Sequence, residues 1–286
     1  MPAEFIALLS ALGWGVNAIL IRQGSRTASI LSAALLSFIV TAIFLWSYLA
    51  LSHSIHLIAS PAAIYFVLSG LMQPLLTRVL SYIGIIRLGV SRSSSLRNTD
   101  PLYTVMFAVI FLQERPGYLI YAGTLFTVAG GWIVLSGRDE KGGFRFRDTL
   151  FPLNSALLAA ISQNLRKVGL LILPNPFVAA AITTLTSLSM LTLYLLISGK
   201  IRSCLPDRAS LPFFGTAALV SIGAQFFNFA ALNKGDVSIV VPLLGTTPLF
   251  SVFLSALFLR SLESVTARVI TGAILMVAGI IFITSR

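Results

Sequence analysis

Long apolar stretches separated by short polar breaks recur along the whole chain. Each stretch is about 20 residues long, which lets a helix cross about 30 Å of hydrocarbon. Because a backbone in lipid must satisfy its own hydrogen bonds, such stretches favour helices over irregular structure. The pattern predicts an all-α integral membrane protein with ten transmembrane helices, at residues 3–21, 30–50, 62–86, 91–112, 117–136, 150–172, 177–198, 211–233, 237–259 and 265–284.

The second half of the chain repeats the first at a nearly constant offset. Residues 7–11 (Ala-Leu-Leu-Ser-Ala) return as residues 156–160 (Ala-Leu-Leu-Ala-Ala). Residues 99–103 (Thr-Asp-Pro-Leu-Tyr) return as residues 246–250 (Thr-Thr-Pro-Leu-Phe). A shared order and offset across half of a chain indicates an internal duplication.

The duplication predicts two repeats of five helices each, at residues 1–136 and 150–286. A hydrophilic linker at residues 137–149, which contains three glycines among its charges, is expected to join them. Since five is an odd number, the second repeat must enter the membrane from the opposite side. Inverted repeats of this kind are typical of carriers that work by alternating access, with the solute site at the repeat interface near the midplane.

Composition and charge support a membrane location and predict an orientation. The apolar fraction of 57% and the mean hydropathy of +0.94 exclude an ordinary water-exposed surface. The net charge of +11 would suggest nucleic acid in a soluble protein, but here it gathers in loops, so no nucleic acid partner is expected. Loops after odd-numbered spans contain Arg22, Arg26, Arg87, Arg138, Lys141, Arg145, Arg147, Lys200, Arg202, Arg208, Arg260 and Arg268, whereas the other side carries only Arg115, Lys234 and Arg286.

By the positive-inside rule, the loops after odd-numbered spans face the cytoplasm and both termini face outward. We expect the plasma (inner) membrane of a prokaryote.

Several kinds of chemistry are not expected from this sequence. Cys204 is the only cysteine, so an intramolecular disulfide is impossible. His53 and His56 share one loop without a third ligand, which predicts neither a metal site nor a bound cofactor. No phosphate-binding loop is present, so ATP-driven pumping is not expected. An enzyme would need a nucleophile and a base, or a metal cluster, in one wet pocket, and we expect no enzymatic activity.

Polar residues inside the apolar spans predict the wall of a solute cavity. A charged side chain near the bilayer centre costs about 2.5 to 3.5 kcal/mol on insertion scales, so it normally faces the protein interior or water. The first and third spans of each repeat carry such residues at matched positions. The candidates are Trp14 and Asn17, with Gln163 and Arg166 as their equivalents, and Arg78, Ser81 and Tyr82, with Gln225 and Asn228 as theirs.

Two alternatives remain open among these candidates. Gln225 and Asn228 could instead provide hydrogen bonds between helices. Arg166 and Lys167 are neighbours and point about 100° apart, so one is expected to face the cavity and the other an interface.

The fourth and ninth spans add further candidates. Arg97 and Asp100 are three residues apart, so they could form an internal ion pair or contact the solute. Thr246, at the position equivalent to Thr99, completes the predicted binding residues. Each span also contains a proline, which removes a backbone donor and predicts a kink. Accordingly, the predicted hinges are Pro101 and Pro248.

A resemblance to a known family rests on these spans. A Pro-Leu pair occurs in both, and Phe111-Leu112-Gln113-Glu114-Arg115 closes the fourth; in the second repeat, Glu263 lacks the adjoining Arg. The chain resembles the EamA family of the drug/metabolite transporter superfamily, which implies two five-helix repeats and transport activity. Members of that family are more often described with cytoplasmic termini, whereas the charge distribution of this chain predicts the opposite.

The charges within the spans predict the class of solute. They comprise Arg78, Arg92, Arg97, Arg166 and Lys167 against Asp100 alone. Such an excess favours anionic or zwitterionic solutes. We expect a monomer, in contact with membrane lipids, that exports or exchanges a small polar metabolite such as an amino acid or organic acid. The alternatives are a flippase for a lipid or lipid-linked sugar and, less favoured, a membrane-embedded enzyme.

Overall fold

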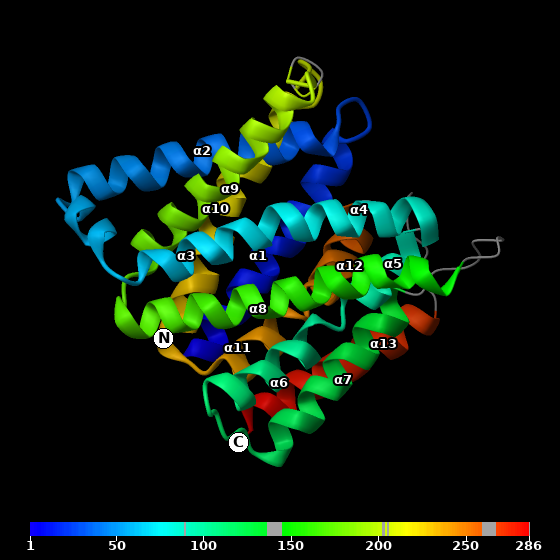
Figure 1. Cartoon of the computed structure of the whole chain (residues 1–286). Coiled ribbons are helices and arrows are strands. Elements are labelled where there is room, and N and C mark those ends of the chain that lie inside the picture. Colours follow the sequence, from blue (N-terminus) through cyan, green and yellow to red (C-terminus); the bar gives the residue numbers. More distant parts are fainter. Residues whose placement is uncertain (89, 136–144, 202–203, 205, 259–266, 286) are drawn as a thin grey trace.

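The computed structural model describes residues 1–88, 90–135, 145–201, 204, 206–258 and 267–285, and all regular secondary structure in them is helical (Figure 1). The described residues leave out most of the predicted linker. They also leave out the last residue of the ninth predicted span, the first residues of the tenth, and Glu263 between them. The helices are α1 (Ala3–Gly24), α2 (Ile30–Leu51), α3 (Ala63–Gly70), α4 (Thr77–Leu88), α5 (Val90–Arg97), α6 (Asp100–Phe111), α7 (Tyr118–Leu135), α8 (Leu150–Ile172), α9 (Pro176–Ile197), α10 (Leu211–Lys234), α11 (Val237–Leu244), α12 (Thr247–Phe258) and α13 (Ala267–Thr284). Shorter helical turns are η1 (Ile55–Ala59), η2 (Leu71–Leu76) and η3 (Phe146–Thr149).

Eight helical segments in the described part of the chain are long and apolar enough to cross a membrane. One of them joins α3 to α4 through η2, and another continues from α11 into α12. The other two predicted spans are helical but do not meet this criterion. The fourth is interrupted between α5 and α6, and α8 carries the charges of Arg166 and Lys167.

Helices α7 and α13 come from different halves of the chain and run antiparallel with their backbones in contact. A Cβ atom added to Gly123 would lie 2.8 Å from the carbonyl oxygen of Gly279, and one added to Gly130 would lie 2.6 Å from that of Gly272. Gly272 and Gly279 are the repeat equivalents of Gly123 and Gly130 at an offset of 149 residues. Each helix therefore contacts the other through equivalent glycines, and the two helices run in opposite directions.

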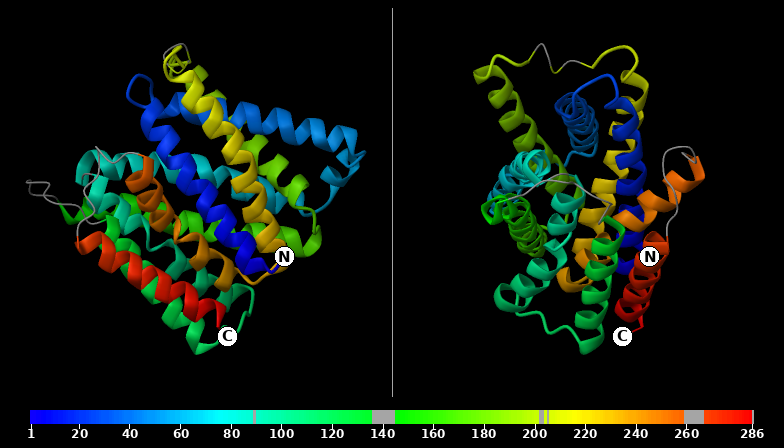
Figure 2. Two further views of the ribbon diagram at one scale, coloured as in Figure 1. Left: turned by 180° about the vertical axis from the view of Figure 1, so that it is seen from behind. Right: turned by 90° about the vertical axis from the view of Figure 1, so that its right-hand side faces the viewer.

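The connections between helices gather at two ends of the molecule (Figure 2). One end, here called the terminal side, holds both chain termini and the turns around residues 52–62, 112–117, 173–175 and 235–236; there Gly235 packs against Ala3. The other end, here called the basic side, holds the turns around residues 25–29, 198–201 and 206–210, where the Thr27 hydroxyl donates to Asp207 Oδ1 at 3.2 Å.

The larger apolar core lies on the terminal side. It joins the beginnings of α1, α3, α7 and α9 to the ends of α2, α6, α8, α10 and α13, and it includes most of the apolar residues of α11. Ile6, Phe66, Leu170 and Val240 are representative members. A smaller cluster on the basic side joins the start of α2 to the end of α9 around Cys204. Apolar packing thus closes the terminal side more completely than the basic side.

Candidate functional site

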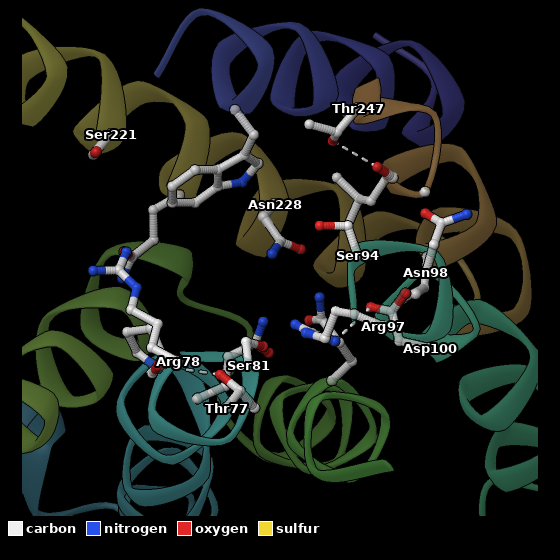
Figure 3. Close-up of a pocket in the computed structure, with 18 of the residues that line it drawn as sticks. Thr77, Arg78, Ser81, Ser94, Arg97, Asn98, Asp100, Ser221, Asn228 and Thr247 are labelled. Atoms are coloured by element: carbon white, nitrogen blue, oxygen red, sulfur yellow. Dashed lines mark hydrogen bonds and ion pairs between the residues drawn. The ribbon is translucent and has the colours of Figure 1, made fainter. Parts of the chain in front are cut away.

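A cavity of about 480 Å³ lies between the two halves of the chain (Figure 3). Its wall extends to Ile85, Ser93 and Leu135, which lie toward the basic-side ends of α4, α5 and α7. Toward the terminal side it is bounded by Val241 of α11, beyond which the larger apolar core begins. Of the predicted residues, those that line it are Trp14, Arg78, Ser81, Arg97, Asp100, Gln163, Arg166, Gln225, Asn228 and Pro248.

Four predicted residues lie elsewhere. Asn17 is buried between α1 and α10, where its amide nitrogen donates to the Ala217 carbonyl at 2.8 Å and the Ser221 hydroxyl at 2.7 Å. Tyr82 is half-buried on α4 and does not line the cavity. Thr246 is fully buried, and Pro101 packs against Gly245.

The guanidinium of Arg166 is largely occupied by contacts within the protein. Nε donates to the Ser69 hydroxyl at 2.8 Å, Nη1 to Gln163 Oε1 at 3.3 Å and Nη2 to the Gln73 carbonyl at 3.4 Å. It also lies 5.0 Å from the centre of the Phe229 ring. Arg166 therefore holds α8 against α3 and η2 at the edge of the cavity.

Lys167, the neighbour of Arg166, makes its contacts at the end of another helix. Its side chain is buried, and Nζ donates to the carbonyls of Leu232 at 2.9 Å and Gly235 at 2.8 Å. These groups belong to the C-terminal end of α10, where the helix dipole favours a positive charge. Lys167 therefore acts as a helix cap.

Arg97 and Asp100 form a loose pair on the cavity wall. Arg97 Nη1 lies 3.6 Å from Asp100 Oδ2, beyond ordinary hydrogen-bond length. The same nitrogen is buried without a hydrogen-bond partner among the described residues. The pair compensates the two charges in part and leaves donor capacity for a further acceptor.

Arg78 has the most available donors of the three cavity arginines. Its guanidinium lies 5.3 Å from the centre of the Phe38 ring. No hydrogen bond or ion pair links it to any described residue. In Figure 3, Arg78 and Arg97 reach into the space from opposite sides, and Asn228 lies between them. With Arg166 and one aspartate, the lining carries an excess of two positive charges.

Sequence analysis missed several hydroxyl and amide residues of the wall. They include Gln73, where the backbone leaves the helical conformation (φ −130°, ψ 129°). The side-chain Oε1 atom of Gln73 is buried without a hydrogen-bond partner among the described residues. Asn228 Oδ1 is likewise buried without a hydrogen-bond partner among the described residues. A glutamine directly before a mid-span proline was an available signal for Gln73. The other missed residues are Ser37, Thr41, Thr77, Ser93, Ser94, Asn98, Thr184, Ser221 and Thr247.

The predicted hinges are helix interruptions at equivalent places rather than bends in continuous helices. The chain leaves the helix between α5 and α6 and again between α11 and α12, just before each proline. At the first break the Thr99 hydroxyl donates to the Leu96 carbonyl at 2.7 Å, and at the second the Thr246 hydroxyl donates to the Leu243 carbonyl at 2.6 Å. These equivalent threonines satisfy carbonyls that the interruptions free from the helical ladder.

Comparisons with known proteins place the whole chain in one family and one fold. The model of the EamA-like transporter family matches residues 1–136 and again residues 150–285. Comparison with curated proteins gives no significant match. One solved structure, titled only "Crystal structure of protein", is similar over 99% of this chain and 96% of its own, with a TM-score of 0.81 and 18% sequence identity. That likeness is one of fold.

Proposed function

Because the chain belongs to the EamA-like transporter family of the drug/metabolite transporter superfamily, we propose that it is a secondary carrier for a small anionic or zwitterionic metabolite. Its apolar helices and its family make it an integral membrane protein. The cavity of about 480 Å³ is the proposed solute site, and its volume suits a metabolite.

Arg78 is the main support for the proposal that the solute carries a negative charge. A guanidinium that lines a cavity without a hydrogen bond or ion pair to the described residues offers paired N–H donors to a carboxylate or phosphate. Arg97 retains an unbonded nitrogen despite its nearness to Asp100, so it can supply a second contact. The solute anion is therefore proposed to lie against Arg78 and Arg97.

Two acceptors in the wall suit a solute that also carries donors. Asn228 Oδ1 and Gln73 Oε1 are buried without partners in the described residues, which is costly unless a ligand or water completes them. An ammonium or hydroxyl group would do so, as in an amino acid or a hydroxy acid. A wall rich in charged and amide side chains favours such solutes over a lipid.

We further propose that the chain crosses the membrane ten times as two inverted repeats, with the basic side in the cytoplasm. The antiparallel glycine contacts of α7 and α13 support the inverted arrangement of the repeats. The excess of Lys and Arg at one end supports the orientation. A cavity that extends toward the cytoplasm is ready to accept a solute for export or exchange.

Transport in proteoliposomes tests the function. A panel of amino acids, organic acids and cations is measured with and without a pH gradient, because Asp100 is the carboxyl on the cavity wall that could carry a proton. We expect uptake of anions or zwitterions, and a loss of about tenfold or more for Arg78→Ala and Arg97→Ala. Arg92→Gln, at an exposed position on α5, is the matched control. Unchanged transport of every accepted solute in both variants would refute the assignment of the cavity.

Thiol labelling tests the orientation. Single cysteines at Ser54 on the terminal side and at Ser198 on the basic side, each in a Cys204→Ser background, are exposed to an impermeant reagent in intact cells. We expect labelling at Ser54 and protection at Ser198. The reverse result would invert the proposed orientation, and labelling of both from outside would refute the alternation of the crossings.

A further inference from the structure

Glu114 joins the first half of the chain to the second across the terminal side. It lies in the turn after α6, where Oε1 accepts a hydrogen bond from the backbone N–H of Val237 and Oε2 accepts one from that of Ser238, both at 2.9 Å. These two amides begin α11, and the first amides of a helix have no partner within it. The carboxylate of Glu114 therefore caps a helix 123 residues away in the sequence.

The cap is supplied from a distance although a local one is at hand. Asp236 stands at the N-cap position of α11, yet its side chain makes no capping hydrogen bond. An N-cap aspartate ordinarily accepts from the second or third amide of its own helix. Here the charge that stabilises α11 depends on the position of α6 relative to α11, and so on the relative position of the two halves.

Helix α11 is the element that separates the cavity from the terminal side. Val241 and Leu244 line the cavity, whereas Val237, Val240 and Leu243 are buried in the terminal-side core. The helix packs against α1, α6 and α7. For a solute to leave on the terminal side, α11 must separate from these neighbours.

The equivalent element of the first half is packed differently. Helix α5, which precedes α6 as α11 precedes α12, packs against α4, α7 and α8. Comparable packing of α5 against α12 is absent from the described residues. Packing of α11 therefore closes the terminal side of the cavity, whereas α5 does not close the basic side in the same way.

We propose that Glu114 is a latch: its two hydrogen bonds hold α11 in the closed position on the terminal side, and they must break each time the cavity opens there. Glu114 is a positioning residue, because it acts through α11 and touches no solute. This inference rests on the proposed carrier function. Lys167 does not serve the same purpose, since it caps α10 from α8, within one half of the chain.

The accessibility of a cavity cysteine tests the latch without any need to know the solute. The reporter is Leu244→Cys in a Cys204→Ser background, in membrane vesicles of both orientations treated with an impermeant methanethiosulfonate. With Glu114 in place, we expect reaction mainly from the basic side. Glu114→Gln removes the charge and one acceptor, so the terminal-side rate is expected to rise about tenfold, the effect of one charge-assisted hydrogen bond on a two-state population.

A matched control separates the latch from helix capping in general. Asn175 Oδ1 accepts from the backbone N–H of Phe177 at 3.1 Å and from that of Val178 at 3.2 Å, and so caps the start of α9 locally. Asn175→Ala removes a cap that also holds two helix amides but lies within one half of the chain, and it is expected to leave the terminal-side rate unchanged. Glu114→Asp, whose shorter side chain cannot reach both amides, is expected to give an intermediate rate.

The outcomes distinguish the latch from the carrier proposal. An unchanged basic-side rate shows that each variant is folded. If that rate is preserved and neither Glu114 variant raises the terminal-side rate, the latch proposal is overturned. If the parent reporter reacts equally from both sides, the alternating-access proposal fails whatever Glu114 does.

Discussion

At the scale of single residues, polar side chains in the helices differ by the partners they find rather than by their chemical type. Asn17 and Arg166 occupy equivalent positions, and both donate to a helix of the opposite half. Both therefore stabilise the contact between the halves. Arg78, which insertion into lipid disfavours just as strongly, has no such partner among the described residues and faces the cavity.

The cap formed by Lys167 gives a prediction about stability. Lys167→Met keeps the length of the side chain but removes both hydrogen bonds to the end of α10, and we expect a loss of about 2 kcal/mol. Thermal unfolding in detergent measures it as a lower midpoint. Lys234→Met, at an exposed position in the last turn of the same helix, should change the midpoint little. Equal midpoints for the two variants would show that the cap does not stabilise the fold.

The ion pair between Arg87, in the last turn of α4, and Asp148 of η3 predicts that the stability of the protein depends on pH. The side-chain hydrogen bond from Arg87, 2.9 Å long, lowers the pKa of Asp148 below its ordinary value of 3.8. A lowered carboxyl pKa adds stability above the unfolded value, and this stability is lost as pH falls through the folded value. The midpoint of Arg87→Gln should therefore fall below that of the parent near neutral pH, and the gap should narrow below about pH 4. A gap that widened on acidification would contradict this assignment.

At the scale of elements, α5 and α11 show how a duplicated element diverges. Equivalent threonines, Thr99 and Thr246, close the end of each with a hydrogen bond to a leucine carbonyl. The sequences between differ, since residues 90–97 read Val-Ser-Arg-Ser-Ser-Ser-Leu-Arg and residues 237–244 read Val-Ser-Ile-Val-Val-Pro-Leu-Leu. The two helices therefore end in the same way, but α11 offers mainly apolar side chains for packing and α5 mainly polar ones.

The contact of α7 with α13 gives a prediction at this scale. A Cβ on Gly130 would lie 2.6 Å from the Gly272 carbonyl oxygen, so Gly130→Ala must push the two helices apart, at a cost of about 1 to 3 kcal/mol. Gly223→Ala in α10 is the control, because its Cβ would meet nothing within 4 Å and alanine favours the helix. Thermal unfolding in detergent should lower the midpoint of the first variant only. A similar loss in both would mean that the close approach is unimportant.

At the scale of the whole molecule, the two sides of the cavity differ in how readily they can close. The terminal side buries the apolar α11, whereas closure of the basic side would have to bury Ser94 and Arg97 of α5, which are only partly buried on the cavity wall. Burial of unpartnered polar groups is costly. The conformation in which the cavity extends to the basic side is therefore expected to dominate in the absence of solute.

An apolar substitution on α5 tests this difference. Ser94→Val introduces the residue found at the equivalent position, Val241, and adds about 1 kcal/mol in favour of closure. The terminal-side labelling rate of the Leu244→Cys reporter, which follows the less populated conformation, should then rise about fivefold. Thr216→Val, at an exposed position on α10, is the control and should have no effect. An unchanged rate in Ser94→Val would show that the composition of α5 does not set the balance.

The sequence by itself determined the helices, the duplication and the polar positions worth considering. Apolar runs of membrane length leave the backbone few alternatives to a helix, and the offset of about 147 to 149 residues pairs Gly123 with Gly272 and Thr99 with Thr246. Arg78, Arg97 and Asn228 could be named as candidates because polar groups in lipid-length spans need an explanation.

Only the tertiary structure decided which of these groups the protein itself satisfies and which side of the cavity is closed. Asn17 and Lys167 find carbonyls on other helices, and Glu114 finds two amides in the opposite half. No local pattern encodes such partners, because they lie tens to hundreds of residues away and meet only when the helices pack. The availability of Arg78 and the closure at α11 follow from that packing.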